Sequence, residues 1–205
     1  MTLPNHPVAV HLVDDEAPVR DALEFLFSSH GFSVCSYANG PTFLAALDGP
    51  TPVRGCILLD VRMEPLSGLQ VYDELAARGN TLPVIFLTGH GDIPMAVEAL
   101  KKGAFDFVEK PFGDAALVER VRDALAVEAA QQQRLAEGDA RGAKLAGLTQ
   151  REREVMHRVA AGKLNKVIAD EMHISVRTVE VYRARVYAKL AVRSSAELAT
   201  LLAKA

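Results

Sequence analysis

The sequence has few cysteines and no long apolar run, and these absences limit what the protein can be. No stretch approaches the roughly 20 apolar residues that a membrane helix needs. The first residues lack the basic start and apolar core of a secretory signal, so we expect a cytoplasmic protein without a membrane partner. Cys35 and Cys56 fall in predicted strands, where we expect small, reduced core residues. No cysteine and histidine cluster has the spacing of a zinc site.

Charge is distributed unevenly along the 205 residues. Residues 1–147 contain 12 Lys and Arg against 20 Asp and Glu, a balance of −8. Residues 148–205 contain 11 against 6, a balance of +5. An acidic first part followed by a basic second part indicates that only the second part meets a polyanion such as nucleic acid.

Short apolar runs alternate with helical patterns in the first part of the chain. The runs at 8–13, 32–37, 55–60, 83–88 and 105–109 are typical of buried parallel strands. Helical patterns follow them at 17–29, 41–47, 67–78, 93–102 and 114–127. Five strand–helix units joined by short loops predict an α/β fold, a doubly wound parallel (βα)5 sheet covered on both faces.

Five polar side chains stand at the ends of these strands. They are Asp14, Asp15, Asp60, Thr88 and Lys110. Because ligands of open α/β sheets bind at the carboxyl ends of the strands, we expect these side chains to converge there. Taken singly, each is accounted for as a cap, a strand residue or a loop residue. Together, three carboxylates that repel one another favour a screening cation such as Mg²⁺, and the hydroxyl and ammonium groups favour a phosphoryl group.

The composition changes after residue 127. Residues 128–147 contain little that a core could bury, and they are rich in alanine, glutamine and charge. We expect a partly helical linker in which Gly138 and Gly142 break the helix and give a mobile hinge.

The second part, residues 148–205, is helical throughout. Thr149 and Glu152 form a predicted capping box, and Gly162 ends that helix. Helices are expected at about 164–172, 175–190 and 195–203, giving an all-α four-helix domain. The tight turn before helix 175–190 indicates a helix-turn-helix unit. The apolar face predicted to pack inward on that helix consists of Val176, Val179, Val186 and Leu190.

Motifs of the first part resemble the receiver domain of bacterial two-component response regulators. They are the acidic pair Asp14-Asp15, Asp60, the pair Thr88-Gly89 and the pair Lys110-Pro111. Residues 88–97 and 105–112 resemble the FixJ-like branch of that family. The resemblance covers residues 7–127, so we interpret residues 1–127 as a receiver domain and 128–147 as the linker.

The resemblance also implies a role for each residue. Asp60 would accept a phosphoryl group from the phosphohistidine of a sensor histidine kinase. The implied Mg²⁺ ligands are Asp14, Asp15, Asp60 and the backbone carbonyl of Arg62. Lys110 would pair with the phosphoryl group, and Thr88 and Phe107 would act as the switch. The Lys110-Pro111 peptide bond is usually cis in receivers.

One position departs from the family pattern. Receivers usually have Met-Pro-Gly or a similar run after the acceptor, whereas this chain has Glu64 where proline is usual. We expect Glu64 either to alter Mg²⁺ affinity and phosphoryl lifetime or to be a solvated turn residue. Arg62 and His90 occupy positions that tune this lifetime in the family.

Motifs of the second part resemble the LuxR-type helix-turn-helix. The stretches are 148–155, 165–169, 174–181 and Lys189-Leu190. The resemblance implies binding of double-stranded DNA through helix 175–190, with Glu180, Val181 and Ala184 facing bases. The full set of expected DNA-binding residues is Asn165, Lys166, Arg177, Thr178, Glu180, Val181, Tyr182, Arg183 and Ala184.

The interpretation that follows is a phosphorylation-activated transcriptional regulator. It would dimerise through the 93–112 surface when phosphorylated, bind promoter DNA and contact RNA polymerase. Its own chemistry would be limited to phosphoryl self-transfer and autodephosphorylation at Asp60. An Mg²⁺-dependent phosphatase of the haloacid dehalogenase type normally has a second aspartate two residues after its nucleophile, and here that residue is Arg62. A degenerate receiver that only binds partners is disfavoured by the intact Asp60, Thr88 and Lys110.

Overall fold

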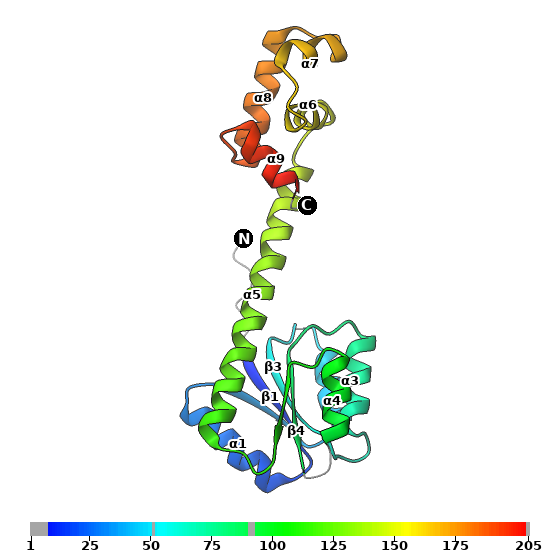
Figure 1. Cartoon of the computed structure of the whole chain (residues 1–205), viewed down its shortest axis with the longest axis vertical. Coiled ribbons are helices and arrows are strands. Elements are labelled where there is room, and N and C mark those ends of the chain that lie inside the picture. The colour runs from blue at the N-terminus through cyan, green and yellow to red at the C-terminus, as the bar shows by residue number, and fades with distance from the viewer. Residues whose placement is uncertain (1–7, 51, 90–92, 204–205) are drawn as a thin grey trace. The chain divides into compact units, whose positions relative to one another are not determined.

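Five parallel strands form one sheet in the first part of this computed structural model, which describes residues 8–203 except 51 and 90–92 (Figure 1). The sheet order is β2-β1-β3-β4-β5. The strands are β1 (Ala9–Val13), β2 (Ser33–Tyr37), β3 (Gly55–Asp60), β4 (Val84–Thr88) and β5 (Asp106–Glu109). The helices that alternate with them are α1 (Ala17–Ser29), α2 (Gly40–Leu47), α3 (Gly68–Ala77), α4 (Ile93–Lys101) and α5 (Asp114–Ala146). The predicted α/β fold is confirmed.

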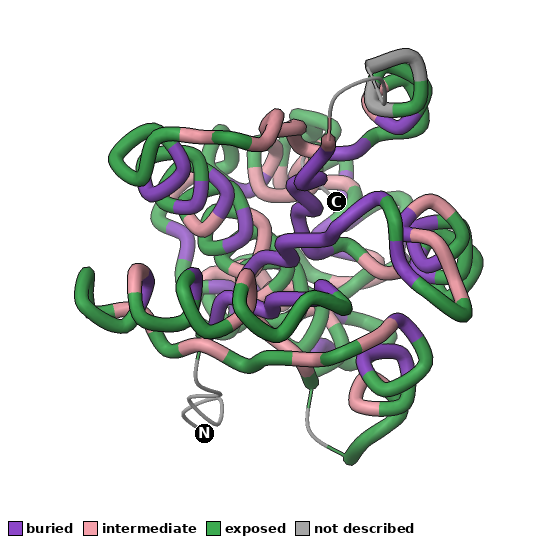
Figure 2. Tube along the Cα trace, turned by 90° about the horizontal axis from the view of Figure 1, so that it is seen from below, coloured by how far each residue is buried: buried purple, intermediate pink, exposed green. Residues whose placement is uncertain are grey.

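The central strands have a separate core on each face of the sheet. Successive strand residues point to opposite faces, so Leu58 and Leu87 pack under α1 and α5. Leu59 and Phe86 pack instead under α2, α3 and α4. Helices cover both faces (Figure 1), and the buried residues are concentrated on the strands and the inner sides of the helices (Figure 2). This arrangement leaves the carboxyl ends of the strands as the edge at which polar side chains can gather.

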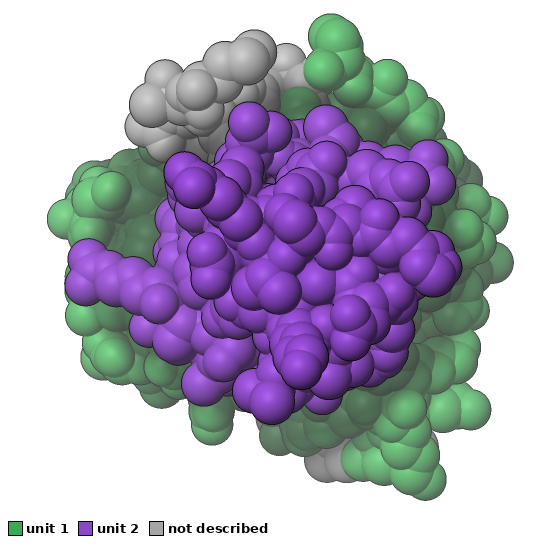
Figure 3. Space-filling view, turned by 90° about the horizontal axis from the view of Figure 1, so that it is seen from above, with its two compact units in different colours: residues 1–131 green, residues 132–205 purple. Residues whose placement is uncertain are grey.

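Helix α5 extends far beyond its predicted end. It runs from Asp114 to Ala146, through both Gly138 and Gly142, so the predicted break at these glycines is wrong. Each glycine costs a helix about 1 kcal/mol relative to alanine, and the strong helix formers around the two glycines offset that cost. The chain divides into two compact units, residues 1–131 and 132–205, which Figure 3 draws in different colours. The dividing point lies within α5.

Four short helices make up most of the second unit. They are α6 (Gln150–Ala160), α7 (Asn165–Met172), α8 (Val176–Leu190) and α9 (Ser195–Ala203). Their apolar side chains form one core, which includes Val155, Ile168 and Val186. The backbone reverses between α7 and α8 at His173, which adopts the left-handed conformation with φ of 54°. The predicted all-α helix-turn-helix domain is therefore confirmed.

Two expectations about burial are wrong. Val176 is 42% exposed because it is the first residue of α8 and precedes the part of the helix that packs on the core. Cys35 is exposed because β2 is an edge strand, whereas Cys56 on the central β3 is buried as expected.

The capping box at the start of α6 is part of a buried polar network. The Thr149 hydroxyl accepts from the backbone N–H of Glu152, and the Glu152 carboxylate accepts from the backbone N–H of Thr149 at 2.8 Å. That carboxylate also accepts from Lys189 Nζ at 2.7 Å, which ties α6 to the end of α8. Glu152 is only 3% exposed.

Glu152 makes the stability of the second unit sensitive to acid. The hydrogen bonds from Lys189 and Thr149 lower the pKa of Glu152 to about 2, from an ordinary 4.5. A lowered pKa in the folded state means that this stabilisation is complete above pH 4.5 and is lost as the pH falls toward 2. We expect Glu152→Gln to flatten the loss of stability in that window, measured by urea unfolding with hydrogen exchange of α6–α9. Glu154→Gln, which removes a partner of the exposed Arg151, is the control. If the free energy of unfolding fell equally steeply with acid in wild type and in Glu152→Gln, the prediction would be contradicted.

Candidate functional site

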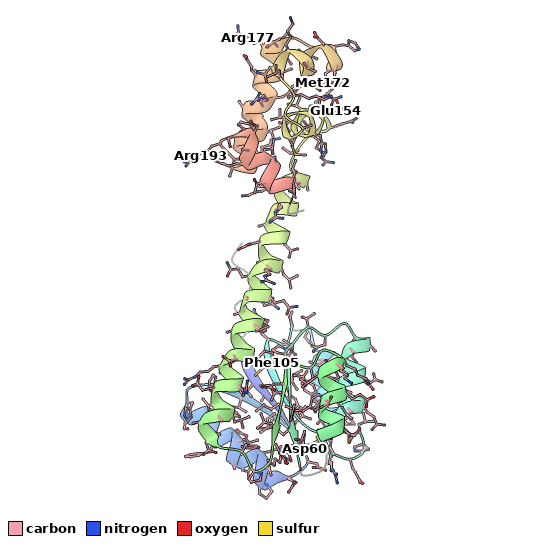
Figure 4. The ribbon with its side chains drawn as sticks, viewed as in Figure 1. Asp60, Phe105, Glu154, Met172, Arg177 and Arg193 are labelled. Carbon is pink, nitrogen blue, oxygen red and sulfur yellow. The ribbon has the colours of Figure 1, made fainter. Side chains whose placement is uncertain are left out.

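The strand register brings four of the five predicted side chains to one edge of the sheet. Val13 lies opposite Leu59 in the β1–β3 pair, so Asp14 and Asp60 follow side by side. Thr88 ends β4 opposite Glu109 of β5, and Lys110 comes next along the chain. Figure 4 labels Asp60 at this end of the sheet.

Lys110 is the centre of the cluster. Its Nζ donates to Asp14 Oδ2 at 2.9 Å and to Asp60 Oδ1 at 2.7 Å. Asp14 is fully buried and Asp60 is 7% exposed. The Lys110–Pro111 peptide bond is cis, as the family resemblance implied. The ammonium thus lies between two carboxylates that would otherwise repel each other across a desolvated space.

Backbone groups hold both carboxylates in place. Asp14 Oδ1 accepts from the N–H of Glu16 at 2.9 Å, and Asp60 Oδ2 accepts from the N–H of Arg62 at 2.8 Å. Arg20, on the first turns of α1, donates to the carbonyl of Asp14 at 2.8 Å. One oxygen of Asp60 therefore faces Lys110 while the other is oriented by the chain that follows β3.

Gly68 at the start of α3 lies against the backbone of Asp60. A Cβ atom at this position would stand 2.1 Å from the carbonyl oxygen of Asp60, so only glycine fits without a shift of the backbone. The N–H of Gly68 donates to the carbonyl of Val61 at 3.0 Å. Neither Arg20 nor Gly68 had been recognised from the sequence.

Burial and charge act in opposite directions on the central pair. Desolvation raises the pKa of Asp60, the hydrogen bond from Lys110 lowers it, and the charge of Asp14 raises it, with a net increase. For Lys110, desolvation lowers the pKa, but the bonds to Asp60 and Asp14 outweigh it and raise the pKa overall. The lysine is therefore charged at neutral pH and positioned where a phosphoryl group on Asp60 would gather negative charge.

The other predicted residues lie around this centre and differ in how far they are exposed. Asp15 is exposed next to the buried Asp14, and Arg62 and Glu64 are exposed after β3. Thr88 is fully buried, and its hydroxyl donates to the carbonyl of Val108 at 3.5 Å. Phe107 is half-buried against the core under α3 and α4. His90 lies outside the described residues.

The donor atoms at this edge suit a hard cation. Among the described residues, no three histidine, cysteine or carboxylate side chains are grouped closely enough to bind a metal ion by themselves. Mg²⁺ does not require such a group, because it keeps several waters and binds proteins through one or two carboxylates. The oxygens of Asp14 and Asp60 therefore fit Mg²⁺.

The exposed side of α8 is the candidate DNA interface. Arg177, Glu180, Val181 and Ala184 are exposed on it. The remaining residues predicted to bind DNA, apart from the exposed Lys166, are half-buried at its edges: Asn165, Thr178, Tyr182 and Arg183. The Ser175 hydroxyl caps the helix by accepting from the N–H of Thr178 at 3.0 Å.

Comparison with known proteins decides the family. The response regulator receiver domain profile matches residues 10–122, and the profile of bacterial regulatory proteins of the luxR family matches residues 146–202. The transcriptional regulatory protein FixJ of Azorhizobium caulinodans is 48% identical over 92% of this chain and 89% of that protein. The chain belongs to the FixJ-type response regulators.

Other relatives of this FixJ-type regulator agree over its full extent. The C4-dicarboxylate transport transcriptional regulatory protein DctR of Rhodobacter capsulatus is 50% identical over 94% of this chain and 98% of that protein. The structure of the response regulator StyR matches with a TM-score of 0.88 and 37% identity, over 98% of this chain and 100% of StyR. Full-length FixJ from B. japonicum matches with a TM-score of 0.61 and 41% identity, over 96% of both chains.

The pairing of the two domains identifies the activity. A receiver joined to a LuxR-type DNA-binding domain makes this FixJ-type chain a phosphorylation-activated transcriptional regulator rather than a typical enzyme. Within the described residues, no helix has the length and apolar character needed to cross a membrane.

Proposed function

We propose that Asp60 is the phosphoacceptor of this regulator. The observation that carries the proposal is the cluster in which Lys110 Nζ lies within 2.9 Å of both Asp14 and Asp60. An oxygen of Asp60 would attack the phosphorus of a phosphohistidine on a sensor kinase. The N–P bond breaks as the O–P bond forms, and the imidazole regains a proton from solvent.

The residues around Asp60 would share the work of this transfer. Lys110 offsets the charge of the incoming phosphoryl group while it remains bonded to Asp14. The carboxylates of Asp14, Asp15 and Asp60 and the backbone carbonyl of Arg62 would hold Mg²⁺. When bound, Mg²⁺ neutralises phosphoryl oxygens and supports an in-line transfer. Autodephosphorylation at Asp60 would return the protein to its resting state.

The switch would start at Thr88 and Phe107. The new phosphoryl oxygens offer the Thr88 hydroxyl a stronger acceptor than the carbonyl of Val108, which it contacts at a long 3.5 Å. Movement of Thr88 would leave space for the half-buried Phe107 and reshape the surface of residues 93–112. We propose that this surface forms a homodimer after phosphorylation.

The second unit would bind double-stranded DNA in the cytoplasm, where promoters and RNA polymerase lie. Helix α8 would enter the major groove with Glu180, Val181 and Ala184 toward base edges. Basic residues around this helix, among them the exposed Lys166 and Arg177, would contact phosphates. RNA polymerase is the expected further partner of a promoter-bound dimer.

This chain has a hollow beside the proposed acceptor to which a sensor kinase could dock. An open hollow of about 760 Å³ lies between α1 and the segment that follows β5, and apolar side chains provide most of its lining. Phe25 on α1 is 78% exposed there, and Lys110 borders the same hollow. A kinase that seated an apolar side chain in this hollow would bring its phosphohistidine close to Asp60.

Removal of the Phe25 ring tests this docking surface. We expect Phe25→Ala to slow phosphoryl transfer from a sensor kinase that modifies the wild type by at least about tenfold, the effect of losing one apolar contact of 1.4 kcal/mol or more. The rate with a small phosphodonor should not change, since that donor needs no docking. Leu135→Ala, which removes another exposed apolar side chain, is the control. Equal slowing with both donors would rule out a docking role.

The proposed function as a whole is tested by phosphorylation and DNA binding of the intact chain. The protein is incubated with Mg²⁺ and a small phosphodonor such as phosphoramidate, and the acyl phosphate is detected by its cleavage with hydroxylamine. Affinity for duplexes selected from a random pool is then measured before and after phosphorylation. A stable acyl phosphate with increased affinity supports the regulator, whereas rapid release of phosphate without it would indicate a phosphatase.

A further inference from the structure

A second hollow, in the DNA-binding unit, is lined by residues from four consecutive segments. It has a volume of about 460 Å³ and lies where the turn after α6, the start of α7, the middle of α8 and the start of α9 meet. Its lining residues are Val159, Gly162, Lys163, Leu164, Asn165, Arg183 and Ser195. Among the described residues that line the hollow, none is a carboxylate. A ligand in the hollow would therefore meet hydrogen-bond donors and positive charge.

Arg183 is held in this hollow by neutral partners. One nitrogen of its guanidinium donates to Asn165 Oδ1, and another donates to the hydroxyl of Tyr187 at 3.0 Å. The guanidinium also lies 5.6 Å from the centre of the Tyr187 ring. Among the described residues, Arg183 makes no ion pair.

Lys163, the other basic side chain that lines the hollow, differs from Arg183 because it has a carboxylate partner. Lys163 and Arg158 both pair with Glu171, and Lys189 pairs with Glu152. The charge of Lys163 is thus partly offset within the protein, while that of Arg183 is not. An uncompensated guanidinium with a fixed orientation favours an anion with several acceptor oxygens.

The position of the hollow indicates which anion this is. Arg183 lies on α8 between the exposed Glu180 and Ala184, but turned toward α7 and therefore half-buried. A ligand in the hollow would lie beside the face of α8 that reads bases, at the height of its middle turns. In a helix-turn-helix complex this flank faces the sugar-phosphate backbone rather than the floor of the groove.

We infer that this hollow seats one backbone phosphate of the bound duplex, with Arg183 oriented for it in advance by Asn165 and Tyr187. The inference rests on the proposed DNA binding and deepens it. The phosphate would accept from the remaining N–H groups of Arg183 and from the amide N–H of Asn165, whose oxygen is already used. Ser195 at the start of α9 would donate its hydroxyl. Tyr187 becomes a positioning residue, and α9 gains a direct contact with DNA.

Fixing Arg183 before binding has an energetic consequence. A long side chain that is ordered only on binding loses rotamer freedom at that step, whereas one that is ordered in the free protein does not. Loss of the Tyr187 hydroxyl would therefore weaken DNA binding even though Arg183 keeps its charge. Loss of Arg183 itself would remove a phosphate contact.

The test uses the full-length chain and a duplex selected from a random pool, with fluorescence anisotropy over a range of salt concentrations. Arg183→Ala is expected to weaken binding to this duplex and to an unrelated duplex alike. It should also reduce the salt slope, the slope of log affinity against log salt concentration, by about 1. Tyr187→Phe is expected to weaken binding about three- to tenfold with an unchanged slope, because the charge remains. Ser195→Ala is expected to have a smaller effect of the same kind. In the Arg183→Ala background, Tyr187→Phe should have no further effect.

Two controls match these changes. Arg151→Ala removes an exposed arginine that pairs with Glu154, and Thr200→Ala removes an exposed hydroxyl from α9. Both should leave affinity and slope unchanged. Urea unfolding of each variant reports on the fold. If Arg183→Ala unfolds, Arg183→Lys replaces it. That variant is expected to show intermediate affinity with the wild-type salt slope.

Several outcomes would overturn the inference. They are an unchanged slope in Arg183→Ala, an effect limited to one base pair of the selected duplex, or additive effects of the Tyr187 and Arg183 changes. If the wild type bound no duplex at any salt concentration, the proposed DNA binding would fail, which is a different result from any of these.

Discussion

Asp60→Asn is expected to abolish both the acyl phosphate and the response of DNA affinity to phosphodonor. The substitution keeps the size of the side chain and an oxygen that accepts from the N–H of Arg62, so the fold should persist. It removes the carboxylate proposed as the nucleophile, and with it one of the two negative charges that pair with Lys110. Asp14 is a poor alternative acceptor, because it is fully buried and bonded to Lys110.

The measurement is hydroxylamine-sensitive labelling with a small phosphodonor, followed by DNA affinity of the same sample. Asp48→Asn, which removes the exposed partner of Arg78, is the matched control and should label like the wild type. Undiminished labelling of Asp60→Asn would place the acceptor elsewhere. Labelling that is lost while the donor still increases DNA affinity would separate the switch from this carboxylate.

Arg54→Ala is expected to destabilise the receiver by about 3–5 kcal/mol, the range for breaking a buried ion pair from one side. Two nitrogens of Arg54 donate to the two oxygens of Glu128 on α5. Glu128 is only 2% exposed, so the alanine variant leaves a carboxylate buried without its cation. Urea unfolding measures the loss. Arg122→Ala, which breaks the exposed pair with Glu119, should cost at most about 1 kcal/mol.

A double replacement distinguishes burial of an unpaired charge from loss of packing. Arg54→Met with Glu128→Leu removes both charges and retains apolar volume, so most of the lost stability should return. If the double variant were as unstable as Arg54→Ala, packing rather than charge would explain the effect. Labelling at Asp60 should persist in the double variant, because this pair lies at the start of β3 and Asp60 at its end.

The sequence predicts most of the elements because their signals are local. Apolar runs of strand length and the Thr149 capping box need only a few neighbouring residues to be recognised. Glu128 shows where such reasoning ends. It lies in a stretch that reads as a solvated linker, yet it is buried against Arg54 from a distant segment, and only the tertiary fold brings the two together. The predicted burial of Val176 and Cys35 was wrong for the same reason, since the burial of each depends on its neighbours in space.

The candidate site was predictable to the extent that strand ends determine it. The rule that ligands bind at the carboxyl ends of parallel strands was sufficient to bring Asp14, Asp60 and Lys110 together. The supports of the site were not predictable. The bond from Arg20 to a backbone carbonyl and the contact of Gly68 with Asp60 involve common residue types in unremarkable positions. No spacing or composition distinguishes them in a single sequence.

The contact at Gly68 has a consequence for how this protein can vary. A side chain of any size there would collide with the backbone of Asp60, although Gly68 itself performs no chemistry. Saturation mutagenesis should therefore find position 68 nearly as intolerant as position 60. A natural variant altered at this glycine alone would be inactive, although every reactive group would still be present.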